Sequence, residues 1–372
     1  MQVGATTEIK QDEYRVGLTP TSVRELTFHG HQVLVQSKAG AGIGVRDPDY
    51  ERAGATIVGS AREVFSRAEM IVKVKELLPE EFPLLRDGQV LFTYLHLAPD
   101  PKQTESLIKS GVVAIAYETV TGPNRSLPLL SPMSEVAGRM AVQAGAHCLE
   151  REAGGAGILL GGVPGVKAAN VVVLGGGVVG TNAIRVAMGM EAQVTVVDRS
   201  LPRLKELDFQ FGGRLNTIYS TVEAIEHYVA EADLVIGAVL VPGAAAPRLV
   251  SREMVREMRD RSVVVDVAID QGGCFETAHA TTHSKPTYVE EGVVHYCVAN
   301  MPGAVARTST FALNNATLPY VLALADKGYR QALLDDPYLL EGLNIHRGKV
   351  TYEAVATALG YEYVPARRVL GT

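Results

Sequence analysis

The sequence has few cysteines, and the ones present form no recognisable pattern. Cys148, Cys274 and Cys297 are widely spaced, form no CxxC pair and are odd in number. This usage argues against a disulfide framework and against a zinc site. It favours a reducing, cytoplasmic compartment.

Blocks of like charge and long apolar runs are absent as well. The formal net charge is −6, and acidic and basic residues are interspersed, so neither nucleic acid nor an anionic membrane is an expected partner. Residues 1–10 lack the apolar core of a signal peptide. No run approaches the roughly 20 apolar residues that span a bilayer. We expect a soluble protein that is not exported.

The chain does have enough apolar residues, and enough length, for a large core. Apolar residues make up 47% of its 372 residues and charged residues 20%, as in globular proteins. The length favours two domains, with a cleft between them. Short β-branched runs alternate with helical patterns, which indicates βαβ units and parallel sheets buried on both faces. The predicted class is α/β.

The pattern predicts individual elements along the chain. A helix over 134–153, with Ser134 as N-cap, separates the two expected domains. After Pro302 the helical material is too short for a third core, so we expect this tail to pack on the first domain. Strands are predicted at 32–36, 71–75, 89–95, 112–118, 170–174, 193–198, 233–241, 262–268 and 293–298, and further helices from Pro20, from Pro101, at 317–327 and at 351–359.

A dinucleotide fingerprint follows the apolar run at residues 170–174. The sequence Gly175-Gly176-Gly177-Val178-Val179-Gly180 leads from that strand into a helical pattern. Gly175 suits a tight turn, Gly177 lets the backbone approach a pyrophosphate, and Gly180 lets the helix pack closely on the strand. The helix N-terminus then meets the phosphate charge. A glycine-rich turn without a ligand is the alternative that this context disfavours.

Asp198 ends the next predicted strand, roughly 20 positions after the first glycine, where an acid accepts hydrogen bonds from the adenosine ribose. This favours NAD over NADP. Arg199 and Arg203 lie close by and are suited to a 2′-phosphate, although the carboxylate would repel one.

Ionisable residues recur where apolar runs end. Lys75, His96, Glu118 and Asp270 each close or follow such a run, and ligands of parallel sheets bind at the carboxyl ends of strands. Taken singly, they also suit a solvated rim, a hydrogen-bonded core histidine or a turn cap. Removing hydride from a carbon that bears an amine or hydroxyl requires a proton acceptor, which makes His96 the leading acid/base candidate.

The other histidines give weaker signals. His295 lies within a predicted strand and is interpreted as structural. His279 and His283 have the spacing of helical metal ligands, but the residues between them are typical of a polar loop. No metal is assigned.

Longer strings resemble a known family, the alanine dehydrogenases, which are related to the NAD-binding subunit of proton-translocating nicotinamide nucleotide transhydrogenase. The resemblance covers essentially the whole chain. It is carried by EYRVGLTP at 13–20, VKVKE at 72–76, YLHLA at 94–98, PMSEVAG at 132–138, DVAIDQGG at 266–273 and VANMPGA at 298–304.

The resemblance implies roles for individual residues. Arg15 and Lys75 would bind the carboxylate and carbonyl of the substrate, His96 would be the general acid/base, and Asp270 a second catalytic carboxyl group. Asn300 and Met301 would lie by the nicotinamide. The other implied cofactor contacts, besides the glycine loop, are Ser134, Asp198, Arg203, Ser220 and the backbone of Val239 and Leu240.

The implied architecture has two doubly wound domains. Residues 1–130 and 307–372 would form a discontinuous, flavodoxin- or Rossmann-like substrate domain, and residues 131–306 a Rossmann domain for NAD. The implied reaction converts L-alanine reversibly to pyruvate and ammonium, in a homo-hexamer. The small residues at 140–146 also suggest close packing of subunits.

Two other functions are left open. One is a transhydrogenase-like subunit that binds NAD and has no amino-acid substrate, which the presence of Arg15, Lys75, His96 and Asp270 together disfavours. The other is a dehydrogenase of a related amino acid.

Overall fold

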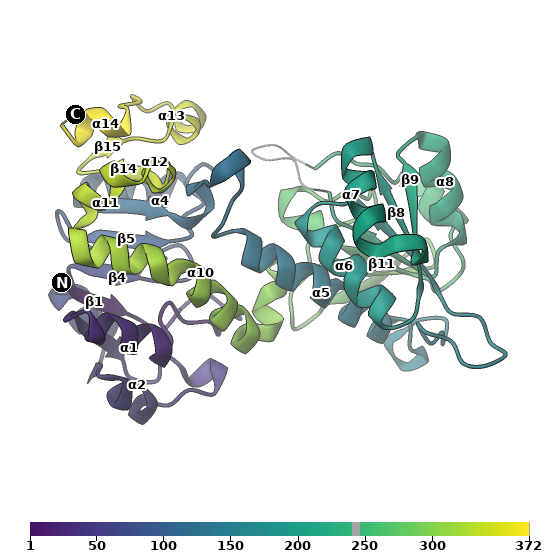
Figure 1. The fold of residues 1–372 in the computed structure, drawn as a ribbon, viewed down its shortest axis with the longest axis horizontal. Coiled ribbons are helices and arrows are strands. Elements are labelled where there is room, and N and C mark those ends of the chain that lie inside the picture. Colours follow the sequence, from purple (N-terminus) through teal and green to yellow (C-terminus); the bar gives the residue numbers. More distant parts are fainter. Residues whose placement is uncertain (240–245, 372) are drawn as a thin grey trace. The chain divides into compact units, whose positions relative to one another are not determined.

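The computed structural model describes residues 1–239 and 246–371. It divides into two compact α/β units (Figure 1). Unit 1 comprises Met1–Met133 and Val305–Thr372, and unit 2 comprises Ser134–Ala304. In the described part of the chain, no helix is both long and apolar enough to cross a membrane.

Unit 1 contains an eight-stranded sheet in the order β15-β14-β6-β5-β4-β1-β2-β3. The first six strands of the chain are parallel and have the spatial order 3-2-1-4-5-6. The sequence left a flavodoxin-like and a Rossmann-like topology open for this domain, and the observed strand order is that of the Rossmann fold. These strands are β1 (Gln2–Ala5), β2 (Gln32–Gln36), β3 (Thr56–Val58), β4 (Met70–Val72), β5 (Val90–Thr93) and β6 (Val113–Ala116).

The C-terminal tail extends this sheet. β14 (Leu343–His346) pairs antiparallel with β6, and β15 (Lys349–Val350) pairs antiparallel with β14. Ile345 is fully buried and belongs to the same apolar core as β4, β5 and β6. The tail is thus an integral part of unit 1.

Helices cover the sheet of unit 1. Leu34 belongs to a core that also contains side chains of α3, α4 and α13. Its neighbours Val33 and Val35 point the opposite way and are also buried, so both faces are covered. The helices are α1 (Pro20–Phe28), α2 (Asp47–Ala53), α3 (Ala61–Arg67), α4 (Pro101–Ser110), α10 (Ala306–Lys327), α11 (Tyr329–Asp335), α12 (Pro337–Leu340), α13 (Glu353–Leu359) and α14 (Ala366–Val369).

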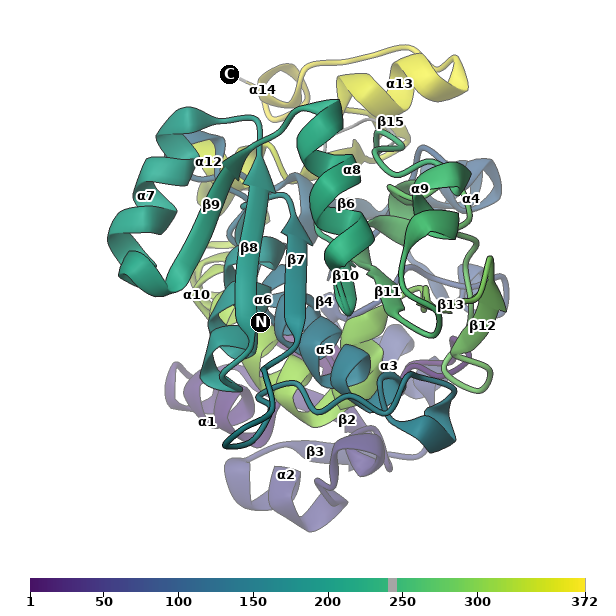
Figure 2. The ribbon, with the colours of Figure 1, turned by 90° about the vertical axis from the view of Figure 1, so that its right-hand side faces the viewer.

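Unit 2 contains a seven-stranded sheet, also with the order 3-2-1-4-5-6 in its parallel part. Figure 2 shows its first three strands side by side, with helices α7 and α8 beside them. A seventh strand, β12 (Thr287–Glu290), pairs antiparallel at one edge. The parallel strands are β7 (Asn170–Leu174), β8 (Gln193–Asp198), β9 (Leu215–Tyr219), β10 (Leu234–Gly237), β11 (Val263–Asp266) and β13 (Val293–Tyr296).

Both faces of this sheet are buried because successive residues of β7 enter different cores. Val171 and Val173 pack with α5, α6 and α7, whereas Val172 and Leu174 pack with α8 and α9. This explains why the strands are continuous apolar runs rather than alternating ones. The helices are α5 (Ser131–Cys148), α6 (Val178–Gly189), α7 (Leu201–Phe211), α8 (Val222–Glu231) and α9 (Arg252–Glu257).

The expected elements agree with the structure to different degrees. β2, β7 and β8 have the predicted bounds, and His295 lies in β13, fully buried, with Nε2 2.7 Å from the Thr277 hydroxyl. The helix predicted over 134–153 is wrong at both ends, because α5 begins at Ser131 and a separate 3-10 turn occupies Arg151–Ala153. Ser134 is therefore inside the first turn rather than the N-cap. The strands β1, β3, β9, β12, β14 and β15 were not predicted.

Candidate active site

In unit 1, ionisable side chains gather at the carboxyl edge of the sheet. β4 ends at Val72, just before Lys75; β5 ends at Thr93, before His96; and β6 ends at Ala116, before Glu118. Because these strands are parallel neighbours, the residues that follow them lie at one edge. β1 lies beside β4, so the strand order reverses at this point, where open α/β sheets bind ligands.

Arg15 is buried at this edge and held by Glu13. Its Nε and one terminal nitrogen donate to the two Glu13 carboxylate oxygens at 2.7 and 2.6 Å, and its other terminal nitrogen lies 3.0 Å from the Met133 sulfur. Burial alone would raise the pKa of Glu13, but the hydrogen bonds and charge of Arg15 lower it. The pair is a fixed, charge-assisted fork.

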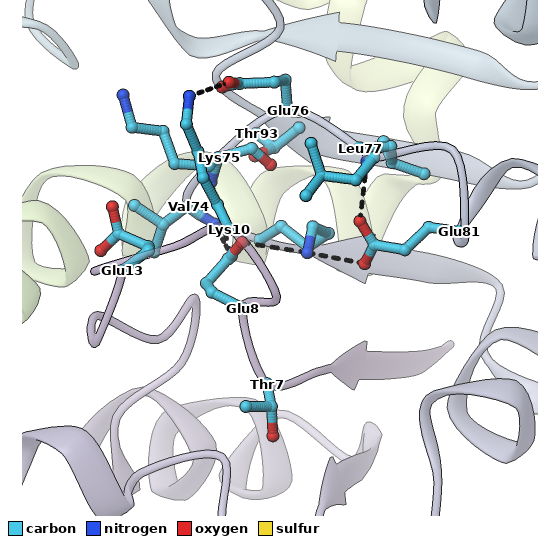
Figure 3. A network of polar contacts seen from close by, with 12 residues as sticks. Thr7, Glu8, Lys10, Glu13, Val74, Lys75, Glu76, Leu77, Glu81 and Thr93 are labelled. Atoms are coloured by element: carbon cyan, nitrogen blue, oxygen red, sulfur yellow. Dashed lines mark hydrogen bonds and ion pairs between the residues drawn. The ribbon is translucent and has the colours of Figure 1, made fainter.

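Lys75 has an altered electrostatic environment. Burial, followed by the charge of Arg15, lowers the pKa of the Lys75 ammonium below its usual range, while Glu76 and Glu13 act in the opposite direction. Glu76 itself forms an ion pair with Lys10. Figure 3 shows the Lys75 and Lys10 side chains extending in the same direction, with the Glu76 carboxylate beside them.

His96 is held through its backbone and exposes its ring. The residue has φ +49°, a conformation that few non-glycine residues adopt, and its amide donates to Glu118 at 2.6 Å. The Glu118 carboxylate also accepts the Leu95 amide at 3.2 Å. The ring stacks on Tyr94, and its side chain is 45% exposed. A strained backbone that fixes an exposed imidazole is suited to acid/base chemistry.

Sequence reasoning missed the contacts of two carboxylates here. Glu118 was among the ionisable residues at strand ends, with a solvated rim as the alternative when taken singly, but its hold on the His96 turn was not predicted. Glu13 was quoted only within the string at 13–20, yet it orients Arg15. Its place two residues before a candidate arginine was the only signal, and pairing across a turn is not visible in a linear pattern.

The glycine loop of unit 2 is built as its pattern requires. Gly175 has φ +99°, and a Cβ on Gly180 would lie 1.8 Å from the Gly175 carbonyl oxygen, so both positions need glycine for the fold itself. Gly177 differs, because no described atom outside its immediate neighbours lies within 4 Å of an added Cβ. The described structure therefore gives no internal reason for glycine at 177.

The same loop opens α6 without a capping side chain. Gly177 is the N-cap, and no side chain in the described residues accepts from the first amides of this 12-residue helix. Exposed amides at a helix N-terminus are suited to an anion. With the open space at Gly177, this fits a pyrophosphate. Val178 and Val179 are the first two residues of the helix.

Asp198 and Ser220 lie at the same edge, and Asp198 contacts the glycine loop. Its carboxylate accepts the Gly176 amide at 2.7 Å and the Ser200 amide at 2.8 Å, and its carbonyl accepts the Ser220 amide at 3.0 Å. The side chain is only partly buried, so the carboxylate stays accessible beside the glycine loop.

Arg203 is engaged by the protein. Its guanidinium donates to the Gly176 carbonyl at 2.7 Å and to the Thr181 hydroxyl at 2.6 Å, and pairs with Glu206 at 2.5 Å. Arg199 is exposed. The structure thus uses Arg203 to brace the glycine loop.

The remaining predicted cofactor residues occupy different environments. Ser134 lies in the first turn of α5, and Val239 follows β10 close to Gly175; Leu240 lies outside the described residues. Asn300 has φ +60°, and its carbonyl lies 3.2 Å from His283 Nε2. Met301 is buried in the core of unit 2.

Asp270 follows β11 at a greater distance than the predicted strand 262–268 implied. β11 ends at Asp266, and Asp270 lies exposed in the following 3-10 helix, Val267–Gln271. The strand-end acid is Asp266, which is buried and accepts the amides of Ala268 and Cys274 at 3.0 and 2.9 Å. Burial raises the pKa of Asp266 to about 6. The apolar run continued past the strand because the 3-10 helix is also largely buried.

The comparisons with known proteins cover both units. Residues 4–137 match the model of the alanine dehydrogenase/PNT N-terminal domain, and residues 141–353 match that of its C-terminal domain. An alanine dehydrogenase from Halomonas elongata is 60% identical over 371 residues, which is 100% of both chains.

The chain belongs to the alanine dehydrogenase/PNT family. Solved structures from this family extend the likeness to the fold. A structure of L-alanine dehydrogenase has a TM-score of 0.95 at 55% identity, covering 97% of this chain and 99% of that one. A transhydrogenase from Sinorhizobium meliloti has a TM-score of 0.84 at 26% identity, covering 94% and 100%.

In this alanine dehydrogenase/PNT chain, two glycines of the loop provide a matched pair of tests. Gly177→Ala should leave the unfolding temperature unchanged, because φ is −67° and there is room for a methyl group, but weaken NADH binding about 10-fold, or ~1.4 kcal/mol. Gly180→Ala should instead lower the free energy of unfolding by about 1–3 kcal/mol, because the added methyl group would clash with the Gly175 carbonyl oxygen. Thermal unfolding and NADH fluorescence titration measure the two effects. A Gly177→Ala protein that binds NADH as tightly as wild type would contradict the approach of the loop to the pyrophosphate.

Proposed function

We propose that this protein is an NAD-dependent alanine dehydrogenase. It converts L-alanine, NAD⁺ and water to pyruvate, ammonium, NADH and a proton, and it catalyses the reverse reaction. The observation that carries the proposal is the grouping of Arg15, Lys75 and His96 at the carboxyl edge of the unit 1 sheet. The site combines a carboxylate-binding cation, a second cation for a polarised oxygen, and an exposed acid/base group. The identity to alanine dehydrogenases supports the choice of substrate.

Unit 1 is proposed to bind the amino acid. Arg15, oriented by Glu13, would bind the substrate carboxylate, because a planar guanidinium matches its geometry. Lys75 would donate to the carbonyl oxygen of pyruvate, where negative charge develops as ammonia adds to the carbonyl carbon. The fixed position of both cations supplies orientation, a major part of the rate gain in such reactions.

His96 is proposed as the general acid/base. In oxidation it accepts a proton from the water that attacks the imine carbon, and in the reverse direction it returns that proton to the hydroxyl group, which leaves as water. Glu118 fixes the turn that carries the ring. Asp270, exposed in unit 2, is proposed as a second carboxyl group for the protons of the amine and water.

Unit 2 is proposed to bind the cofactor. Gly175, Gly177, Gly180 and the first amides of α6 would hold the pyrophosphate, and Asp198 the ribose hydroxyls. NAD, when bound, supplies the acceptor for the hydride that leaves the α-carbon of alanine. The other proposed contacts are Ser134, Arg203, Ser220, Val239, Leu240, Asn300 and Met301.

Two features support NAD over NADP. The Asp198 carboxylate would repel a 2′-phosphate, and Arg203 is already engaged by Gly176, Thr181 and Glu206. Arg199 is the exposed cation nearest in sequence, so NADPH is the appropriate comparison substrate in kinetic assays.

We also propose a homo-hexamer, on the basis of the family resemblance. The residues at 140–146 do not support this as expected, because Ala141, Val142 and Ala144 are buried within the core of unit 2. Apolar side chains at Leu159, Val163 and Val166 are instead 66%, 53% and 63% exposed, and exposed apolar groups of this kind are suited to a subunit contact.

The function is tested by oxidation of NADH with pyruvate plus ammonium. We expect turnover that requires both, in the range of roughly 1–1000 per second typical of enzymes. Binding of NADH without turnover of this pair would favour a transhydrogenase-like subunit. Turnover with another keto acid but not with pyruvate would favour a dehydrogenase of a related amino acid.

Replacement of His96 tests the acid/base role. His96→Ala should lower kcat by about 10²–10⁴-fold, because proton transfer is lost, while the affinity for NADH is retained. His227→Ala, which changes an exposed histidine on α8, is the matched control and should leave kcat unchanged. A His96→Ala enzyme with normal kcat would refute the assignment.

The pKa of Lys75 predicts a pH dependence. Because that pKa is lowered, the ammonium loses its proton at a lower pH than an exposed lysine, so substrate binding weakens as pH rises through the alkaline range. As the pH is raised, KM for pyruvate should therefore begin to increase before pH 10.5 is reached, the usual pKa of a lysine, while KM for NADH stays constant. In Lys75→Arg the cation persists, and the rise should disappear; a rise of equal size in that variant would show that another group titrates.

A further inference from the structure

The segment that carries Lys75 is fixed by an unusually complete set of hydrogen bonds. β4 ends at Val72, yet every backbone amide and carbonyl of residues 73–75 has a partner in the described structure. Most of these partners lie on or just beyond β5, which neighbours β4, and β6, which is the next strand in the sheet. They are the Phe92 carbonyl, the Tyr94 amide, the Thr93 hydroxyl, the Tyr117 hydroxyl and the Glu8 carboxylate.

Glu8 supplies the acceptor for two of these amides. Its Oε1 accepts the Val74 amide at 2.6 Å and lies 3.4 Å from the Lys75 amide. β1 pairs with β4 only through its residues Val3 and Gly4 and ends at Ala5, so it pairs no further along the segment that leads to Lys75. Beyond the end of β1, the Glu8 side chain provides the acceptor that a longer strand would have provided through its backbone (Figure 3).

Glu8 is itself anchored by a buried ion pair. Its Oε2 lies 3.0 Å from Lys73 Nζ, which lies 2.8 Å from Glu81 Oε1, and the three side chains are at most 4% exposed. Figure 3 shows Glu8 and Glu81 below Lys75, with the two contacts drawn as dashed lines between them. Buried ion pairs are often no more stabilising than apolar side chains of similar size. Stability alone therefore gives a weak reason for two carboxylates and an ammonium at this place.

We propose that Glu8 is a positioning residue for Lys75: its carboxylate fixes the backbone from which the Lys75 ammonium reaches the substrate. The role rests on the function proposed above for Lys75. Lys73 pairs with the carboxylate on its other side, and Glu81 is a second partner of Lys73 that does not contact Glu8 directly. The reach of the Glu8 side chain, rather than its charge alone, sets the position of the catalytic ammonium.

Changes in length and charge separate these two properties. Glu8→Asp keeps the charge and a partner for Lys73 but shortens the side chain by one methylene, so it cannot hold Lys73 and reach both amides. Glu8→Gln keeps the length and an acceptor oxygen but removes the charge. Glu81→Asp is the matched control, because it shortens the other carboxylate that pairs with Lys73. The Glu81 carboxylate accepts the Leu78 amide at 3.1 Å and no amide of residues 73–75.

The first readout is kcat/KM for pyruvate at saturating ammonium and NADH. We expect about a tenfold loss in Glu8→Asp, since small displacements of a substrate-binding group are costly. Glu8→Gln should stay within about threefold of wild type, and Glu81→Asp should be unchanged; KM for NADH should not move in any variant. An unchanged Glu8→Asp, or equal losses in Glu8→Asp and Glu81→Asp, overturns the proposal, as does a larger loss in Glu8→Gln than in Glu8→Asp.

A second readout does not depend on turnover. Hydrogen exchange at the Val74 and Lys75 amides should be faster in Glu8→Asp than in wild type and unchanged in Glu81→Asp. Equal exchange in all three proteins overturns the positioning role whatever the activity. An inactive wild type would instead contradict the proposed function, so the two claims can fail separately.

Discussion

Two buried cations at the carboxyl edge of the unit 1 sheet determine which side chains surround them. Arg15 is buried against Glu13, and Lys73 is buried between Glu8 and Glu81. An isolated ion in such a place costs several kcal/mol, so each cation needs a partner at hydrogen-bond distance. These partners fix the loops that follow β1 and β4, and these loops carry Arg15 and Lys75.

The two units share one sheet topology but carry different residues at the carboxyl ends of their strands. Both have the strand order 3-2-1-4-5-6, and in both the residues of interest follow the strands at the reversal point. In unit 2 the loop after β7 is made of glycines and leaves a helix N-terminus open to an anion. In unit 1 the loop after β1 carries Glu8, Glu13 and Arg15 instead. The fold supplies the edge, and the loop sequence decides what binds there.

Much of this was predictable from the sequence, and the failures have identifiable causes. The bounds of β7 and the roles of Gly175 and Gly180 in the turn follow from local rules on apolar runs and backbone freedom. The half-exposed edge strand β9 and the antiparallel β14 were missed, because neither forms a continuous apolar run.

The candidate active site also combines features that follow from local sequence with features that depend on contacts between distant segments. The strand-end pattern identified Lys75 and His96 correctly as residues of one edge. It extended the strand before Asp270 too far, since β11 ends at Asp266 and a largely buried 3-10 helix continues the apolar run. The roles of Glu8, Glu13 and Glu118 depend on contacts between segments, such as the 2.6 Å bond from Val74 to Glu8 across 66 positions, and periodicity does not encode these.

The central claim is that the carboxyl edge of the unit 1 sheet is the substrate site. A crystal structure of the protein with NADH and pyruvate, without ammonium, tests it most directly. The account predicts that the pyruvate carboxylate contacts the Arg15 guanidinium, that its carbonyl oxygen contacts the Lys75 ammonium, and that the His96 ring lies beside the carbonyl carbon. Pyruvate bound elsewhere, with no contact to these three side chains, would contradict it.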